Sequence, residues 1–152
     1  MLIIVLFRDT TAEWVLGDFF LACECDRDSS GHSTPYSRGT AGYRPPELLK
    51  EDMPRFTSKV DIWSLGCVMY ELCTGKRAFE SDFSIFMSAQ NPPLHLVIHM
   101  EGAEERTNAR LQTILQAMLE FNPSKRPTAE SLVITFEECL GRGISTLGIK
   151  VI

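Results

Sequence analysis

Histidine and cysteine side chains are the first candidates in this chain for ligands of a zinc-type metal ion. His95 and His99 stand four positions apart, a spacing that can place two imidazoles on one face of a helix. No cysteine or acidic residue accompanies them with a usable spacing, so surface or core histidines are the favoured interpretation. The five cysteines form no CxxC pair and no zinc spacing, which indicates reduced thiols in a cytoplasmic or nuclear protein.

Asp61 is the carboxylate whose expected surroundings need explaining. It stands near the start of a predicted helix, residues 56–75, whose apolar side chains cover nearly every side, as in a helix at the centre of a fold. Ser58 is placed to cap this helix with Asp61 as an acidic variant of the capping box, and Gly75 is placed to end it. Because a buried carboxylate requires hydrogen-bond donors, we expect Asp61 to need partners.

The rest of the chain is predicted to form shorter elements around this helix. Two apolar runs, 2–6 and 14–16, predict a β-hairpin at the start. Helical periodicity predicts a short helix over 83–89 capped by Asp82, a helix over 107–121 and a last helix that opens at Pro127. Residues 94–99 alternate partly and could be extended. No repeat or linker divides the chain, so we expect one unit, 1–140, followed by a flexible tail, 141–152.

The overall charge limits the classes of partner. The formal net charge is −5 across 152 residues, without a block of basic residues, which disfavours nucleic acid and anionic membranes. The apolar start, residues 1–7, is too short to span a bilayer and lacks a basic flank, so a buried strand is expected. A solubilising surface is the favoured interpretation of this net charge.

Several motifs, in the right order, are similar to those of the protein kinase family. Arg44-Pro45-Pro46-Glu47 stands where that family has Ala-Pro-Glu, before the helix that resembles the central helix of the kinase C-lobe. Upstream, Asp18-Phe19-Phe20 resembles the Asp-Phe-Gly motif with its glycine replaced. Residues 119–127 resemble the link between the last two helices. The resemblance covers 6–136 and implies a mainly α fold, the helical C-lobe with a short N-terminal β-hairpin.

The resemblance also implies roles for single residues. Asp18 matches the position of a Mg²⁺ ligand, here considered vestigial, because phenylalanine cannot adopt glycine's conformations cheaply. Thr40 matches the threonine beside the acceptor hydroxyl in serine/threonine kinases. Glu47 and Arg126 match an ion pair that fastens the activation segment to the helical body. Asp61 matches an aspartate that binds the catalytic loop, and since that loop is absent from this sequence we expect its carboxyl to ionise less readily.

Residues 23–38 correspond to the activation loop and are polar and rich in serine and glycine. Two interpretations stay open, a loop regulated by phosphorylation and a solvated loop that is never phosphorylated. The candidate acceptors are Ser29, Ser30, Ser33, Thr34 and Ser37.

The family activity is ATP-dependent and Mg²⁺-dependent phosphoryl transfer to protein serine or threonine. This sequence contains no glycine-rich loop, no lysine of the third strand and no catalytic loop with its Asp and Asn. Whether the chain is an enzyme is therefore left open. We expect a truncated kinase domain that is inactive and binds neither ATP nor Mg²⁺, and the alternative is a pseudokinase-like scaffold for protein partners such as a kinase-related protein.

Overall fold

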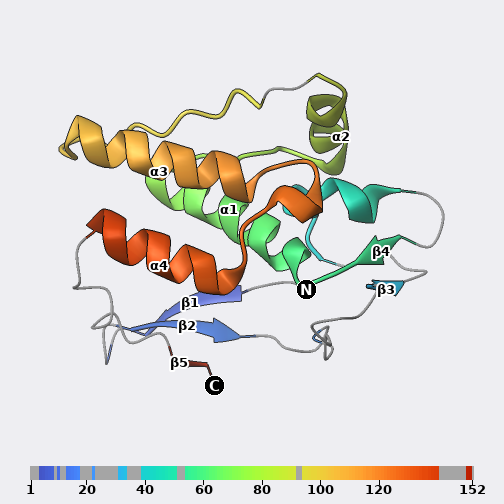
Figure 1. Ribbon diagram of the computed structural model, residues 1–152, viewed down its shortest axis with the longest axis horizontal. Coiled ribbons are helices and arrows are strands. Elements are labelled where there is room, and N and C mark those ends of the chain that lie inside the picture. Colours follow the sequence, from blue (N-terminus) through green and yellow to red (C-terminus); the bar gives the residue numbers. More distant parts are fainter. Residues whose placement is uncertain are drawn as a thin grey trace.

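The computed structural model describes residues 4–8, 10, 13–17, 22, 31–33, 39–50, 54–91, 94–140 and 150–151. Helices dominate this part of the chain (Figure 1), which confirms the mainly α prediction. The α-helices are α1 (Lys59–Thr74), α2 (Asp82–Gln90), α3 (Glu105–Met118) and α4 (Ala129–Leu140). Two single-turn 3-10 helices, η2 (Pro46–Leu49) and η3 (Pro123–Lys125), precede α1 and α4 respectively.

The predicted N-terminal hairpin is present. Strands β1 (Ile4–Arg8) and β2 (Glu13–Gly17) pair antiparallel with Ile4 opposite Gly17, and residues 2–3 of the first predicted run lie outside the described residues. Strand β5 (Lys150–Val151) pairs parallel with β2, and the rest of the predicted tail lies outside the described residues. A separate two-stranded sheet joins β3 (His32–Ser33) to β4 (Arg55–Phe56).

Helix α1 is central, as its composition predicted. It lies between α3 and α4 in Figure 1, and its residue Ile62 belongs to one buried cluster with Ile114 of α3 and Leu132 of α4. The close approach to α3 depends on Gly66, because an added Cβ would lie 2.9 Å from Cδ2 of Leu119. The apolar character of nearly every side predicts that neighbouring segments surround the helix, and this is wrong at Leu72, which is 63% exposed near the end of the helix.

The two ends of α1 differ in how well they were predicted. Gly75 ends the helix with φ of +68°, and its N–H donates to the carbonyl of Glu71 at 2.8 Å, as expected for a left-handed glycine cap. At the start, Ser58 makes no capping hydrogen bond, so the capping box with Asp61 is a wrong prediction. The physical reason is that Ser58 already has helical dihedral angles, whereas an N-cap side chain reaches the helix from an extended backbone.

The boundaries of the later elements also required correction. Ser81, and not Asp82, caps α2: its hydroxyl accepts from the N–H of Ser84, and the hydroxyl of Ser84 accepts from the N–H of Ser81. Asp82 is the first residue of the helix. Residues 94–100 form no strand; instead Gln112 of α3 holds this stretch by accepting from the N–H of Ile98 and donating to the carbonyl of Leu96, both at 2.7 Å.

Candidate functional site

The predicted site residue Thr40 lies exposed on a tight turn formed by residues 39–43, which is called the Thr40 turn below. The N–H of Tyr43 donates to the carbonyl of Thr40 at 3.1 Å, and glycines with positive φ stand on both sides of the threonine, Gly39 at +90° and Gly42 at +82°. Gly42 is buried, and an added Cβ there would lie 2.7 Å from the carbonyl oxygen of Phe79. The turn therefore exposes Thr40 to solvent, while Gly42 packs closely against the segment before α2.

Tyr43 attaches this turn to α1. Its hydroxyl donates to the carboxylate of Glu71, and its carbonyl accepts from the hydroxyl of Ser64 at 3.0 Å. The guanidinium of Arg77 lies 5.8 Å from the centre of the tyrosine ring. Burial raises the pKa of Tyr43, and the carboxylate of Glu71 raises it further, so the phenol stays protonated and remains a donor.

Arg44 and Asp82 attach the same turn to α2. The two carboxylate oxygens of Asp82 are both used, one accepting from the N–H of Gly42 at 2.9 Å and the other from Nη1 of Arg44 at 2.6 Å. Nε of Arg44 donates to the carbonyl of Gly39 at 2.8 Å. These contacts were not predicted, because the sequence marks Asp82 only as a residue at the start of a helix.

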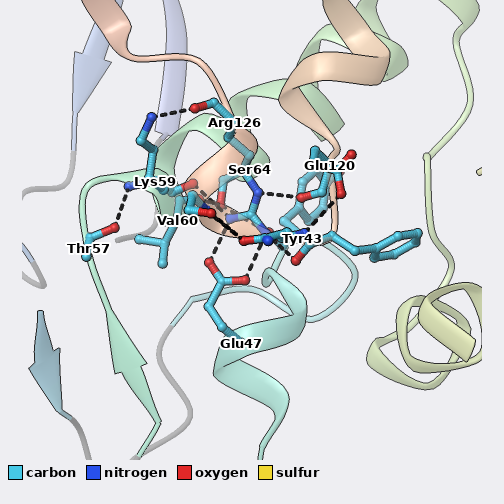
Figure 2. Close-up of polar contacts among 11 residues, drawn as sticks. Tyr43, Glu47, Thr57, Lys59, Val60, Ser64, Glu120 and Arg126 are labelled. Atoms are coloured by element: carbon cyan, nitrogen blue, oxygen red, sulfur yellow. Dashed lines mark hydrogen bonds and ion pairs between the residues drawn. The ribbon is translucent and has the colours of Figure 1, made fainter.

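Glu47 and Arg126 meet in the interior, between η2 and η3. Nη1 and Nη2 of Arg126 lie 2.6 and 2.8 Å from the two carboxylate oxygens of Glu47. Figure 2 shows the guanidinium facing this carboxylate, and it also donates to the carbonyls of Glu120 at 2.7 Å and Lys59 at 3.0 Å. Arg126 further lies 5.0 Å from the ring centre of Trp63. One buried side chain thus ties the end of the segment that carries Thr40 to both α1 and the link before α4.

Of the other residues that the resemblance predicted, some lie outside the described part of the chain and the rest lie in β3 and α1. Asp18 and four of the five candidate phosphorylation sites lie outside the described residues; the fifth, Ser33, is exposed in β3. Asp61 lies in the first turn of α1, where burial raises the pKa of its carboxyl, the expected direction. It is not brought together with Thr40, Glu47 or Arg126 by any hydrogen bond described above.

A metal site is not formed by the part of the chain that the structure describes. Within it, no three His, Cys, Asp or Glu side chains are grouped closely enough to hold an ion, and His95 and His99 are both exposed. Among the residues that the structure describes, no helix has the length and hydropathy that a membrane span requires.

Comparison with known proteins supplies a family context for this geometry. A protein kinase domain model matches residues 5–135. The chain is 35% identical over 114 residues to the serine/threonine-protein kinase Nek1 of Toxoplasma gondii, covering 75% of this chain and 7% of that protein. It is 36% identical over 97 residues to mouse Nek3, with 62% and 17% covered, and 31% identical over 128 residues to Xenopus tropicalis PLK1, with 84% and 20% covered. The chain spans a fifth or less of the length of these relatives.

Proposed function

Because the chain belongs to the serine/threonine protein kinase family, we propose that it is the substrate-facing helical half of a kinase domain. We further propose that these 152 residues alone transfer no phosphate. The observation that carries the first part is the Thr40 turn, which is exposed at its tip and anchored by Tyr43 and Asp82. An exposed tip on a fixed turn suits a segment that contacts a protein substrate, since substrate positioning accounts for much of phosphoryl-transfer catalysis.

The second part rests on the chemistry that the sequence does not supply. Phosphoryl transfer requires a lysine and metal ions around the phosphates and a residue that accepts the hydroxyl proton. None of the motifs that carry these groups occurs in the 152 residues, except for Asp18 in its altered Asp-Phe-Phe motif. Loss of a general base alone costs about 10²-fold to 10⁴-fold in rate, and here the nucleotide-binding half is missing as well.

The assay for this proposal compares the purified chain with its Asp18→Ala variant. Each protein is incubated with radiolabelled ATP, Mg²⁺ and casein or histone as acceptor. We expect no incorporation above background in either sample. Transfer by the unaltered chain that is abolished by Asp18→Ala would refute the proposal of inactivity, while leaving the family unchanged.

Nucleotide binding provides a separate measurement. A good small-molecule site buries most of its ligand, and one hairpin cannot enclose an adenine. We therefore expect no saturable change in melting temperature with Mg-ATP below about 1 mM, a concentration at the weak end of measurable binding. A saturable shift in that range would show that the chain retains a nucleotide site.

The genomic sequence before Met1 tests whether this helical half belongs to a longer kinase domain. An in-frame His-Arg-Asp loop and glycine-rich loop would make these residues one part of a complete kinase. Without them, the chain would act as a separate product.

A protein-binding scaffold is the second candidate, and one observation favours it. Three large apolar side chains of α2, at spacings of three and four residues, are exposed by 69%, 50% and 44%: Phe83, Phe86 and Met87. Such a grouping is typical of protein contact surfaces. A kinase-related protein in the cytoplasm or nucleus is the proposed partner, and calorimetric titration with a Nek-type kinase domain tests it. Binding lost in Phe83→Ser/Phe86→Ser would support the scaffold, and no binding by the unaltered chain would oppose it.

A further inference from the structure

The Thr40 turn has an unusual amount of intrinsic freedom. Two of its residues, Gly39 and Gly42, are glycines in the left-handed region, and glycine loses more conformational entropy on ordering than any other residue. The single hydrogen bond inside the turn, from Tyr43 N–H to Thr40 carbonyl, does not restrain Gly39. A fixed conformation therefore requires contacts from outside the turn.

Asp82 supplies contacts at both ends of the turn. Its Oδ1 accepts directly from the N–H of Gly42 at 2.9 Å. Its Oδ2 lies 2.6 Å from Nη1 of Arg44, and Nε of the same guanidinium donates to the carbonyl of Gly39 at 2.8 Å. One carboxylate thus restrains Gly42 directly and Gly39 through Arg44, with Thr40 between them.

A simpler role for Asp82 would be stabilisation of its own helix. Acidic residues in the first turn favour helices by interacting with the macrodipole, and aspartate is a frequent cap. The cap of α2, however, is formed by the reciprocal hydrogen bonds of Ser81 and Ser84. Both oxygens of Asp82 are engaged with residues about 40 positions earlier in the chain, so its side chain is directed at the turn.

Packing supports the same assignment. The buried Gly42 lies so close to the segment before α2 that a Cβ would meet the carbonyl oxygen of Phe79 at 2.7 Å. The side chains of Arg44 and Asp82 are largely shielded from solvent, so salt weakens their attraction less than it weakens a fully exposed pair. The turn is thus held against α2 by close packing together with a charge-assisted hydrogen bond.

We infer that Asp82 is a positioning residue that fixes the Thr40 turn for an incoming protein substrate, and that helix α2 thereby sets how Thr40 is presented. The inference rests on the proposed substrate-facing function. It assigns a positioning role to contacts that are separate from the hydrogen bond of Tyr43 to Glu71 and from the Glu47–Arg126 ion pair that holds the following η2.

Amide hydrogen exchange and the NMR signal of Gly42 test this inference on the whole 152-residue chain. In Asp82→Ala we expect the Gly42 amide to exchange about tenfold faster, the effect of losing one hydrogen bond to a charged group. Amides of the α1 core, such as Cys67, should keep their exchange rates. Asp82→Asn retains a neutral acceptor for Gly42, so its Gly42 chemical shift should lie between those of the unaltered chain and Asp82→Ala.

The exposed Glu80 provides the matched control, because Glu80→Ala removes a carboxylate from the same segment without touching the turn contacts described above. Its Gly42 signal should not move. An unchanged Gly42 signal in folded Asp82→Ala would overturn the inference, as would a uniform increase in exchange across α1 and the turn. If Asp82→Ala does not fold, the measurement uses Asp82→Asn, and an unchanged Gly42 signal in that variant would overturn the inference. These measurements need neither substrate nor nucleotide, so their failure is distinguishable from failure of the proposed function.

Discussion

Glu47 and Arg126 form a buried bidentate ion pair although 79 positions separate them in the sequence. Their relative exposures are only 8% and 2%. The guanidinium is surrounded by acceptors, since the carbonyls of Lys59 and Glu120 bind the N–H groups that Glu47 leaves free (Figure 2). The pair therefore connects three parts of the fold in a geometry that satisfies both charges.

Disruption of this pair from one side is expected to be costly. Glu47→Ala and Arg126→Ala should each lower the free energy of unfolding by about 3–5 kcal/mol, because the remaining charge stays buried. The double variant should cost less than the sum of the two, by roughly 0.5–3 kcal/mol for groups in contact. Urea unfolding of all four proteins measures this coupling. The exposed neighbour Lys125→Ala is the control, and strict additivity would contradict the ion pair.

Gly66 provides a second prediction, at the crossing of α1 with the end of α3. Alanine normally stabilises a helix interior by about 1 kcal/mol relative to glycine. Here its Cβ would lie 2.9 Å from Leu119 Cδ2 and 3.1 Å from Met118 Cβ, so we expect Gly66→Ala to destabilise by about 1–3 kcal/mol. In a Leu119→Ala background the same change should cost less, since part of the obstruction is removed. A net gain in stability from Gly66→Ala alone would disprove the close approach.

The thiol of Cys67 should be unreactive towards thiol reagents in the folded chain. Burial raises its pKa to about 12, so almost none of it is thiolate at pH 8. A thiol reagent such as DTNB should label the partly exposed Cys73 and Cys139 first, and Cys67 only on unfolding. Mass spectrometry of labelled peptides identifies the site. Rapid labelling of Cys67 under native conditions would mean that the core around Trp63 opens readily.

The same pKa shift predicts a dependence of stability on alkaline pH. The folded pKa lies above the ordinary thiol value of 9.0, so the contribution of Cys67 is complete below pH 9 and is lost as pH rises from 9 towards 12. The destabilisation caused by Cys67→Ala should therefore shrink by roughly 1 kcal/mol between pH 8 and pH 10. Other ionisable groups are present in both proteins and cancel in the difference. A constant difference across this range would contradict the shift.

Local signals made much of this fold predictable. The run of apolar residues in α1 and its terminal glycine determined the position of that helix, because both act within a few residues. The sequence could not distinguish Ser81 from Asp82 as the cap of α2, because either side chain can cap a helix. The backbone dihedral angles, which the sequence does not give, identify Ser81 as the cap. Leu72 was not predicted to be exposed, because the composition of a helix indicates an apolar face but does not indicate whether another element covers that face.

The candidate site was predictable only where a motif marks it. Glu47 and Arg126 were assigned together because each stands in a motif of the kinase family. The contact between Arg44 and Asp82 joins residues 38 positions apart, and although Arg44 stands in the Arg-Pro-Pro-Glu motif, no motif marks Asp82. Its formation depends on how the turn and α2 pack, which is a tertiary property that no local pattern encodes.

Asp61 gives a prediction in the acidic range. Burial raises the pKa of its carboxyl in the folded state above the ordinary value for aspartate. At neutral pH the folded protein therefore holds a carboxylate that the unfolded chain would solvate better, so the charged form works against folding. Asp61→Asn keeps the shape of the side chain and removes this charge. We expect the substitution to be neutral or stabilising at pH 7.

The pH dependence distinguishes this account from a simple change in packing. Since the folded pKa is higher than the unfolded pKa, the folded state binds the proton first as pH falls, and the unaltered chain gains stability relative to Asp61→Asn. The advantage of the variant should thus diminish from neutral pH towards the ordinary aspartate pKa and level off below it. Urea unfolding of both proteins at several pH values between 7 and 4 measures this difference. A loss at pH 7 well above about 1 kcal/mol on Asp61→Asn would instead mean that the ionised carboxylate makes a favourable structural contact in the folded chain.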